Sequence, residues 1–137
     1  MNLSDSFETR IYLMFLHFSL LMIIYKKKNS KFSQDSYDSL FHNIENNLRE
    51  LGFGDVSVNK KMKELNKILY DILLKIDKSD DEALIINKEL ILKYFKDLKQ
   101  NNDQKYADFE RYLVNFYNFC FEIPLDNVLR GAIKFTF

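Results

Sequence analysis

Apolar residues recur at three- and four-residue intervals along most of the chain, which is the spacing of one face of an α-helix. Between residues 34 and 51 this face is Tyr37, Leu40, Phe41, Ile44, Leu48 and Leu51. The same spacing predicts helices over residues 58–77, 80–99 and 103–121, and a short helix over 125–131. Residues 133–137 alternate apolar and polar, but a lone strand would lack a partner, so an extended tail is expected there.

An uncharged apolar segment, Ile11–Tyr25, precedes these helices. As a helix it would rise about 22 Å, against a membrane hydrocarbon core of roughly 30 Å. A helix that is hydrophobic nearly all round is typical of a protein core. We therefore expect the central core helix here. The alternative is a membrane-surface helix, although such helices carry a strongly charged face that this segment lacks.

Short polar signals predict where the helices end. Gly52 can take the left-handed conformation that closes a helix, and Gly54 frees the turn that follows. Asp55 or Ser57 is expected to cap the next helix, and Asp80 or Asp81 the one after it. Ile123–Pro124 should end the helix before it, because a residue preceding proline is pushed out of helical geometry.

Composition agrees with a helical protein. The 137 residues are 47% hydrophobic and include only three glycines and one proline, too few for the many turns of a β-sandwich. We predict an all-α fold, a single domain spanning residues 1–137, built as a bundle of five to six helices around the hydrophobic N-terminal helix. The formal net charge is zero, which argues against a general attraction to DNA.

Few residues here are suited to catalysis or metal binding. His17 and His42 fall on different predicted helices, and His17 has no carboxylate near it in sequence. With the single Cys120, two histidines cannot form a structural zinc site by themselves, and Cys120 is expected to be buried. The expectation is a protein that is not an enzyme and has neither metal nor cofactor. The lone cysteine and the lack of a secretory signal favour a cytoplasmic location.

Charged residues gather around the two glycines between the predicted helices. Lys60, Lys61 and Lys63 would lie in the opening turns of a helix, where cations oppose the helix dipole at a cost of up to ~1 kcal/mol. One interpretation is a solvated loop with local pairs such as Lys60 with Glu64. The other is a docking surface on which lysines meet an acidic or phosphate-bearing partner. Both stay open at this point.

The same stretch resembles a known family. The run L-F-H-N-I-E-N-N-L-R-E-L-G-F-G-D-V-S-V-N-K-K-M-K, residues 40–63, resembles the ubiquinol-cytochrome c chaperones. Weaker likenesses are F-E-T-R-I-Y-L-M-F-L-H-F-S-L-L at residues 7–21 and I-P-L-D-N-V-L-R-G-A-I-K-F at residues 123–135. The resemblance implies a chaperone that binds newly made cytochrome b and promotes assembly of the bc1 complex. A small helper protein and peripheral contact with the inner face of the respiratory membrane belong to the same expectation.

Two sets of binding residues are therefore predicted. The partner-binding set is Arg49, Glu50, Gly52, Gly54, Asp55, Ser57, Lys60, Lys61 and Lys63. The candidate groove for an apolar client segment is His17, Phe18, Tyr70, Phe116 and Tyr117. A second hypothesis is a ribosome- or RNA-binding module that uses the lysines from Lys60 to Lys63, and a third is a membrane-surface protein.

Overall fold

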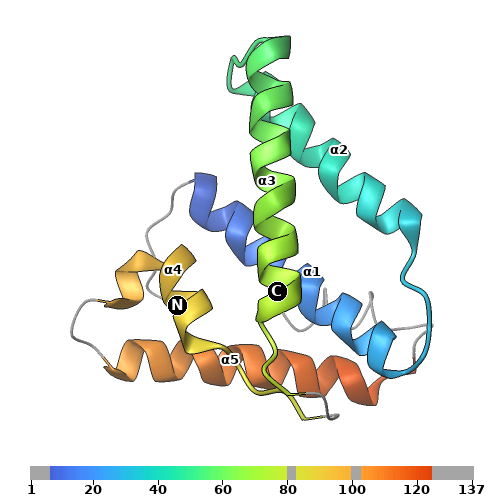
Figure 1. The fold of residues 1–137 in the computed structure, drawn as a ribbon, viewed down its shortest axis with the longest axis vertical. Coiled ribbons are helices and arrows are strands. Elements are labelled where there is room, and N and C mark those ends of the chain that lie inside the picture. The colour runs from blue at the N-terminus through green and yellow to red at the C-terminus, as the bar shows by residue number, and fades with distance from the viewer. Residues whose placement is uncertain (1–6, 80–82, 100–102, 125–137) are drawn as a thin grey trace.

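The computed structural model describes residues 7–79, 83–99 and 103–124, and these are almost entirely helical (Figure 1). The elements are α1 (Phe7–Lys27), α2 (Gln34–Glu50), α3 (Asp55–Lys75), α4 (Lys88–Tyr94), the 3₁₀ helix η1 (Lys96–Lys99) and α5 (Asp103–Glu122). Within this described part, extended backbone pairs only at an isolated bridge between Asp77 and Ile86. The predicted all-α fold is confirmed. The tail and the short helix expected over residues 125–137 lie outside the described residues.

The apolar N-terminal segment forms α1 and supplies the centre of the core, as its sequence predicts. α1 packs against both α3 and α5. Its buried apolar residues are Ile11, Phe15, Leu16, Leu20, Leu21, Ile23 and Ile24. By length and composition α1 could also cross a membrane, but here its side chains fill the interior. Asn29 ends it in the left-handed region (φ 56°), with Ser30 donating its backbone N–H to the carbonyl of Tyr25 at 2.8 Å.

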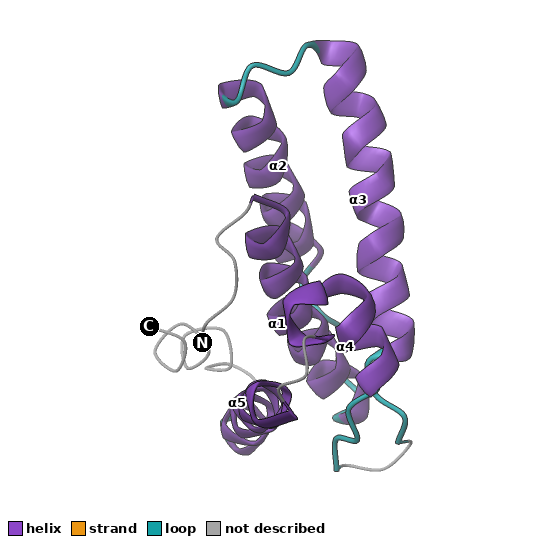
Figure 2. Cartoon of the chain, turned by 90° about the vertical axis from the view of Figure 1, so that its left-hand side faces the viewer, coloured by secondary structure: helices purple, strands orange, loops and turns teal. Residues whose placement is uncertain are grey.

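The other long helices enclose α1 from different directions. α2 and α3 form a hairpin whose joint lies at one end of the molecule, far from α5, which crosses the opposite end (Figure 1). Figure 2 shows α3 at the outer edge, with α1, α2 and α4 all on one side of it. Ile44 and Leu48 of α2 and Leu69 and Ile72 of α3 are fully buried. The hairpin therefore joins the core through one face of each helix.

The continuous helix predicted from Asp80 or Asp81 to Lys99 is wrong. The described helix begins only at Lys88, where the Asn87 side chain accepts the backbone N–H of Leu90 at 3.4 Å. Before it, the backbone is held extended, because Asn87 donates its own N–H to the carbonyl of Ile76 at 2.9 Å. At the other end Phe95 leaves helical geometry (φ −118°, ψ 74°) and turns its ring into the core.

An ion pair between Lys27 and Asp77 connects the end of α1 to the segment after α3, beside α5. Lys27, at the end of α1, donates to Asp77 Oδ2 at 2.7 Å and lies over the ring of Tyr117 in α5. Asp77 Oδ1 also accepts the backbone N–H of Ser79 at 2.9 Å and of Ile85 at 3.1 Å. Burial alone would lower the pKa of Lys27, but its hydrogen bonds to Asp77 and Tyr117 outweigh this and raise the pKa. The ammonium therefore stays charged.

Candidate functional site

The partner-binding residues predicted from the sequence meet at the α2–α3 corner, residues 49–63, at the free end of the hairpin (Figure 1). Gly52 closes α2 in the left-handed conformation (φ 97°), as predicted. Phe53 then donates its N–H to the carbonyl of Leu48 at 3.2 Å and Gly52 donates to Arg49 at 3.0 Å, the two bonds that close a Schellman turn. This turn fixes the direction in which the chain leaves α2.

The predicted caps of α3 are wrong. α3 begins at Asp55, and its N-cap is Gly54, with no side-chain hydrogen bond. Asp55 instead occupies the first turn, where a negative charge suits the positive end of the helix dipole. Ser57 is an exposed residue of the same turn. The helix starts earlier than the apolar pattern indicates. The pattern missed this first turn because Val56 does not face the core.

Three apolar side chains at the corner are exposed, a feature that the sequence reasoning missed. Leu51 is 60% exposed, Phe53 42% and Val56 84%. Leu51 was expected on the inner face of α2, but it is the C-cap residue, beyond the last helical turn. A signal was available, because L-G-F-G-D-V places apolar residues on both sides of a turn that has no core to cover it. The corner thus combines an apolar tip with charge.

The charges at the corner divide into paired and outward-facing groups. The Arg49 guanidinium donates to Glu45 at 3.0 Å and also to Asp55, so it links α2 to the start of α3. Lys61 lies 3.9 Å from Glu8 of α1. Lys60, Lys63 and Glu50 are exposed, and the two lysines make no ion pair with any residue that the structure describes. The positive charge of Lys60 and Lys63 therefore faces solvent.

The five residues of the predicted client groove do not line one surface. Phe116 and Tyr117 are 0% and 1% exposed, inside the core. His17 lies with Phe116, the ring centroids 4.7 Å apart. Phe18 lies elsewhere, edge-on to Phe32 at 5.0 Å and beside Tyr37 at 6.3 Å. Tyr70 is 47% exposed on α3.

His17 holds a defined but chemically quiet position. Its Nδ1 lies 2.6 Å from the carbonyl of Leu13, which can only accept, so Nδ1 carries the proton. Nε2 is then the acceptor for the Tyr112 hydroxyl at 2.7 Å. Burial lowers the pKa of His17, although the bond to Leu13 opposes this. A neutral imidazole whose two nitrogens are both engaged suits a structural link between α1 and α5.

Groups suited to catalysis or metal binding are sparse in the part of the chain that the structure covers. No group of three or more His, Cys, Asp or Glu side chains in the described ranges could hold a metal ion. Cys120 is fully buried as predicted, and burial raises the pKa of its thiol to about 11, so it stays protonated at neutral pH. His42 is exposed on α2.

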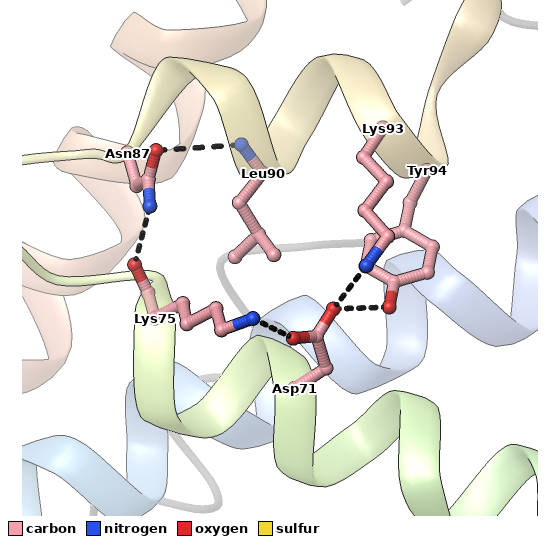
Figure 3. A network of polar contacts seen from close by, with 6 residues as sticks. All are labelled: Asp71, Lys75, Asn87, Leu90, Lys93 and Tyr94. Atoms are coloured by element: carbon pink, nitrogen blue, oxygen red, sulfur yellow. Dashed lines mark hydrogen bonds and ion pairs between the residues drawn. The ribbon is translucent and has the colours of Figure 1, made fainter.

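A polar network fixes α4 against α3 (Figure 3). Asp71 of α3 accepts from Lys75 at 2.7 Å, from Lys93 at 2.9 Å and from the Tyr94 hydroxyl. The bonds from Lys75 and Tyr94, with a further one from Lys93, hold the pKa of Asp71 well below its usual range, although burial opposes this. This carboxylate therefore anchors α4 to α3 through three donors.

Comparison with known proteins agrees with the family indicated by the corner. Searches of curated proteins and of solved structures gave no significant match. The family model described as ubiquinol-cytochrome C chaperone matches residues 1–135, which include the corner and every described helix. Because the match covers nearly the whole chain, the chain belongs to the ubiquinol-cytochrome C chaperone family.

Proposed function

We propose that this protein is a non-enzymatic assembly chaperone that binds newly made cytochrome b and promotes assembly of the bc1 complex. The observation that carries the proposal is the family match over residues 1–135. A chaperone family implies a client protein. Cytochrome b is the client that fits assembly of ubiquinol-cytochrome c reductase, the complex in the family's description.

The α2–α3 corner is the docking surface in this proposal. Its exposed Leu51, Phe53 and Val56 can lose contact with water when a partner covers them, and burial of apolar area drives association. The exposed Lys60 and Lys63 follow this tip along α3 and would orient the client, since opposite charges fix register more than they add affinity. The exposure of these side chains at the free end of the hairpin supports the corner as the client-binding surface.

The predicted groove residues contribute less to client binding in this proposal. Phe116 and Tyr117 would have to leave the core to touch a client, and full burial of an aromatic side chain stabilises the fold too strongly for that. Tyr70 is accessible as the chain stands. We therefore place client contact on the corner and the neighbouring face of α3, at a cytoplasmic site peripheral to the inner face of the respiratory membrane.

Gene deletion followed by complementation tests the proposal. Loss of the gene should lower spectrally detected haem b in the membrane while the cytochrome b transcript is unchanged. The wild-type gene should restore haem b, and a Phe53→Ser, Val56→Ser double variant should restore little of it. Ile85→Ser, which alters an apolar side chain that is 54% exposed away from the corner, is the matched control and should complement fully. Unchanged haem b in the deletion strain would contradict the chaperone role.

The outward-facing lysines keep ribosome or RNA binding as a second candidate. Binding through phosphates weakens steeply as salt rises, whereas capture of an apolar client does not. A salt titration of ribosome co-sedimentation therefore separates the two functions. Salt-sensitive co-sedimentation that requires Lys60 and Lys63 would support the ribosome, and its absence at low salt would exclude it.

A further inference from the structure

The outer face of α3 carries an exposed stripe with the spacing used in helix-to-helix packing. We define the α3 stripe as Val56, Lys60, Lys63, Lys67, Tyr70 and Leu74. Successive members are alternately four and three residues apart, which averages to the 3.5-residue repeat of a coiled-coil seam. Val56 is 84% exposed, Tyr70 47% and Leu74 76%, and the three lysines are also exposed. The stripe runs for about 27 Å along the helix axis.

The described helices leave most of this face uncovered, although Tyr70 is about half-buried beside Tyr37 of α2. The opposite side of α3 enters the core through Val58, Leu65, Leu69 and Ile72. Figure 2 shows the other helices gathered on that core side, which leaves the outer side of α3 open along its length. Val56 and Leu74 thus place an exposed apolar side chain at each end of this seam-like face.

The centre of the stripe is positive. Lys60, Lys63 and Lys67 make no ion pair with any of the residues in the described ranges. Asp71, one helical turn after Lys67 on the adjoining flank, is already bonded to Lys75, Lys93 and Tyr94 (Figure 3). Glu64 lies on the same flank and is the one carboxylate left beside the lysines on α3. The face thus presents apolar, basic and apolar sections in order.

We propose that the α3 stripe binds an amphipathic helix of a partner protein, with carboxylates opposite the three lysines and apolar residues opposite Val56 and Leu74. The repeat fits a helix laid along α3, and the charge order fixes its register. A phosphate-bearing ligand would use the lysines but would gain nothing from Val56 and Leu74. The inference rests on the proposed function, because the α2–α3 corner forms one end of the stripe and the client is the first candidate for the helix.

Photo-crosslinking in cells tests the geometry. A crosslinking amino acid is placed at Lys63, Lys67 or Leu74, with exposed Asn118 of α5 as the control position. The expected result is that all three stripe positions join one partner segment. The sites reached from Lys63 and Lys67 should lie about four residues apart beside acidic residues, and the site reached from Leu74 about seven residues beyond the Lys67 site, among apolar residues. The control position should not join that segment. Crosslinks that fall on unrelated proteins, or on RNA, overturn the proposal.

A binding assay with purified protein tests the charge order. The probe is a labelled synthetic helical peptide with glutamates at three successive seam positions and leucines at both ends. K60E/K63E/K67E should weaken its binding roughly tenfold or more, since each exposed pair contributes modestly. The matched control K26E/K31E/K96E makes the same change in net charge at exposed lysines off α3 and should bind as the wild type does. Circular dichroism checks that both variants keep their helical content.

Exchanging the charges completes the test. A peptide with lysines in place of the glutamates should bind the triple-glutamate variant and not the wild type. Equal binding of both peptides by the wild type overturns the proposal. It is also overturned if the wild type binds neither peptide but binds an RNA oligonucleotide, and the triple variant no longer binds that RNA. A triple variant that restores haem b fully in the deletion strain overturns the stripe alone and leaves the chaperone role standing. Unchanged haem b after deletion contradicts the chaperone role, while the peptide assay still decides the stripe.

Discussion

His17 illustrates how burial decides the chemistry of a single residue. The sequence places this histidine in an aromatic and aliphatic segment with no carboxylate nearby, which argues against a catalytic role. The structure supplies its partners, the carbonyl of Leu13 at 2.6 Å and the hydroxyl of Tyr112 at 2.7 Å. The first could be expected from a helix, because it lies one turn away. The second, 95 residues away in the chain, could not.

The pH dependence of stability should report the neutral state of His17. Burial lowers its folded pKa below 6.5, so the unfolded chain binds the proton first. The stabilising contribution is complete above pH 6.5 and is lost as the pH falls toward the folded pKa. Urea unfolding on both sides of pH 6.5 measures it. His17→Gln keeps an acceptor for Tyr112 but cannot titrate, so an unchanged slope in this variant would refute the assignment.

At the scale of elements, α4 shows where sequence periodicity is insufficient. Apolar residues continue at helical spacing from Leu84 through Leu98, so a long helix is the natural prediction. A seven-residue helix forms instead, and a helix this short depends on its contacts. Asn87 caps it while also donating to the carbonyl of Lys75 at 3.0 Å, and Asp71 holds its other end. The competing bonds to α3 outweigh the local preference.

Removing the Asp71 carboxylate should detach α4 from α3. We expect Asp71→Asn to lower the free energy of unfolding by about 1–3 kcal/mol at neutral pH, because three donors lose a charged acceptor. Since the folded pKa lies below the ordinary 3.8, wild-type stability from this group is complete above pH 3.8 and declines below it. The variant should lose this decline, which chemical denaturation at acidic pH measures.

Asp108→Asn is the control for this effect. Asp108 pairs with Arg111 at 3.1 Å, but its side chain is 54% exposed, against 17% for Asp71. Exposed pairs of this kind contribute about 0–1 kcal/mol. Equal losses in the two variants would mean that the Asp71 network adds nothing to the attachment of α4.

For the whole molecule, the central event is the burial of α1 by helices from both later parts of the chain. α3 and α5 both pack on it, although they are separated from each other in sequence by α4. α5 contributes a row of buried residues: Tyr106, Phe109, Leu113, Phe116, Tyr117 and Cys120. The apolar spacing over residues 103–121 already puts all of these but Tyr106 on one helix face, but it does not show whether another helix covers that face. Tyr106 is buried as well, and burial raises the pKa of its hydroxyl to about 12.

Two phenylalanines of α5 differ in burial, one lying in the core and the other near the surface. Phe116 is 0% exposed and Phe119, one turn away, is 39% exposed. Phe116→Ala should cost about 3–5 kcal/mol, because it leaves a cavity where α1 and α5 meet, and that is a large share of the stability of a typical domain. Phe119→Ala should cost under about 1 kcal/mol. Thermal or urea unfolding compares them, and similar losses would show that α5 does not pack as described.

The sequence by itself determined the helical class, the burial of α1, the left-handed Gly52 and the end of α5 before Pro124. The helical class, the Gly52 conformation and the end of α5 depend on interactions within a few residues, where periodicity and backbone sterics suffice. The burial of α1 depends on distant helices, but its lack of charge between Arg10 and Lys26 is enough to predict it. Only the tertiary structure decided that Phe116 and Tyr117 lie inside while Leu51, Phe53 and Val56 lie outside. Apolar residues look alike in a sequence, and whether one is covered depends on which distant helix reaches it. The extent of α4 was settled the same way, by hydrogen bonds to α3.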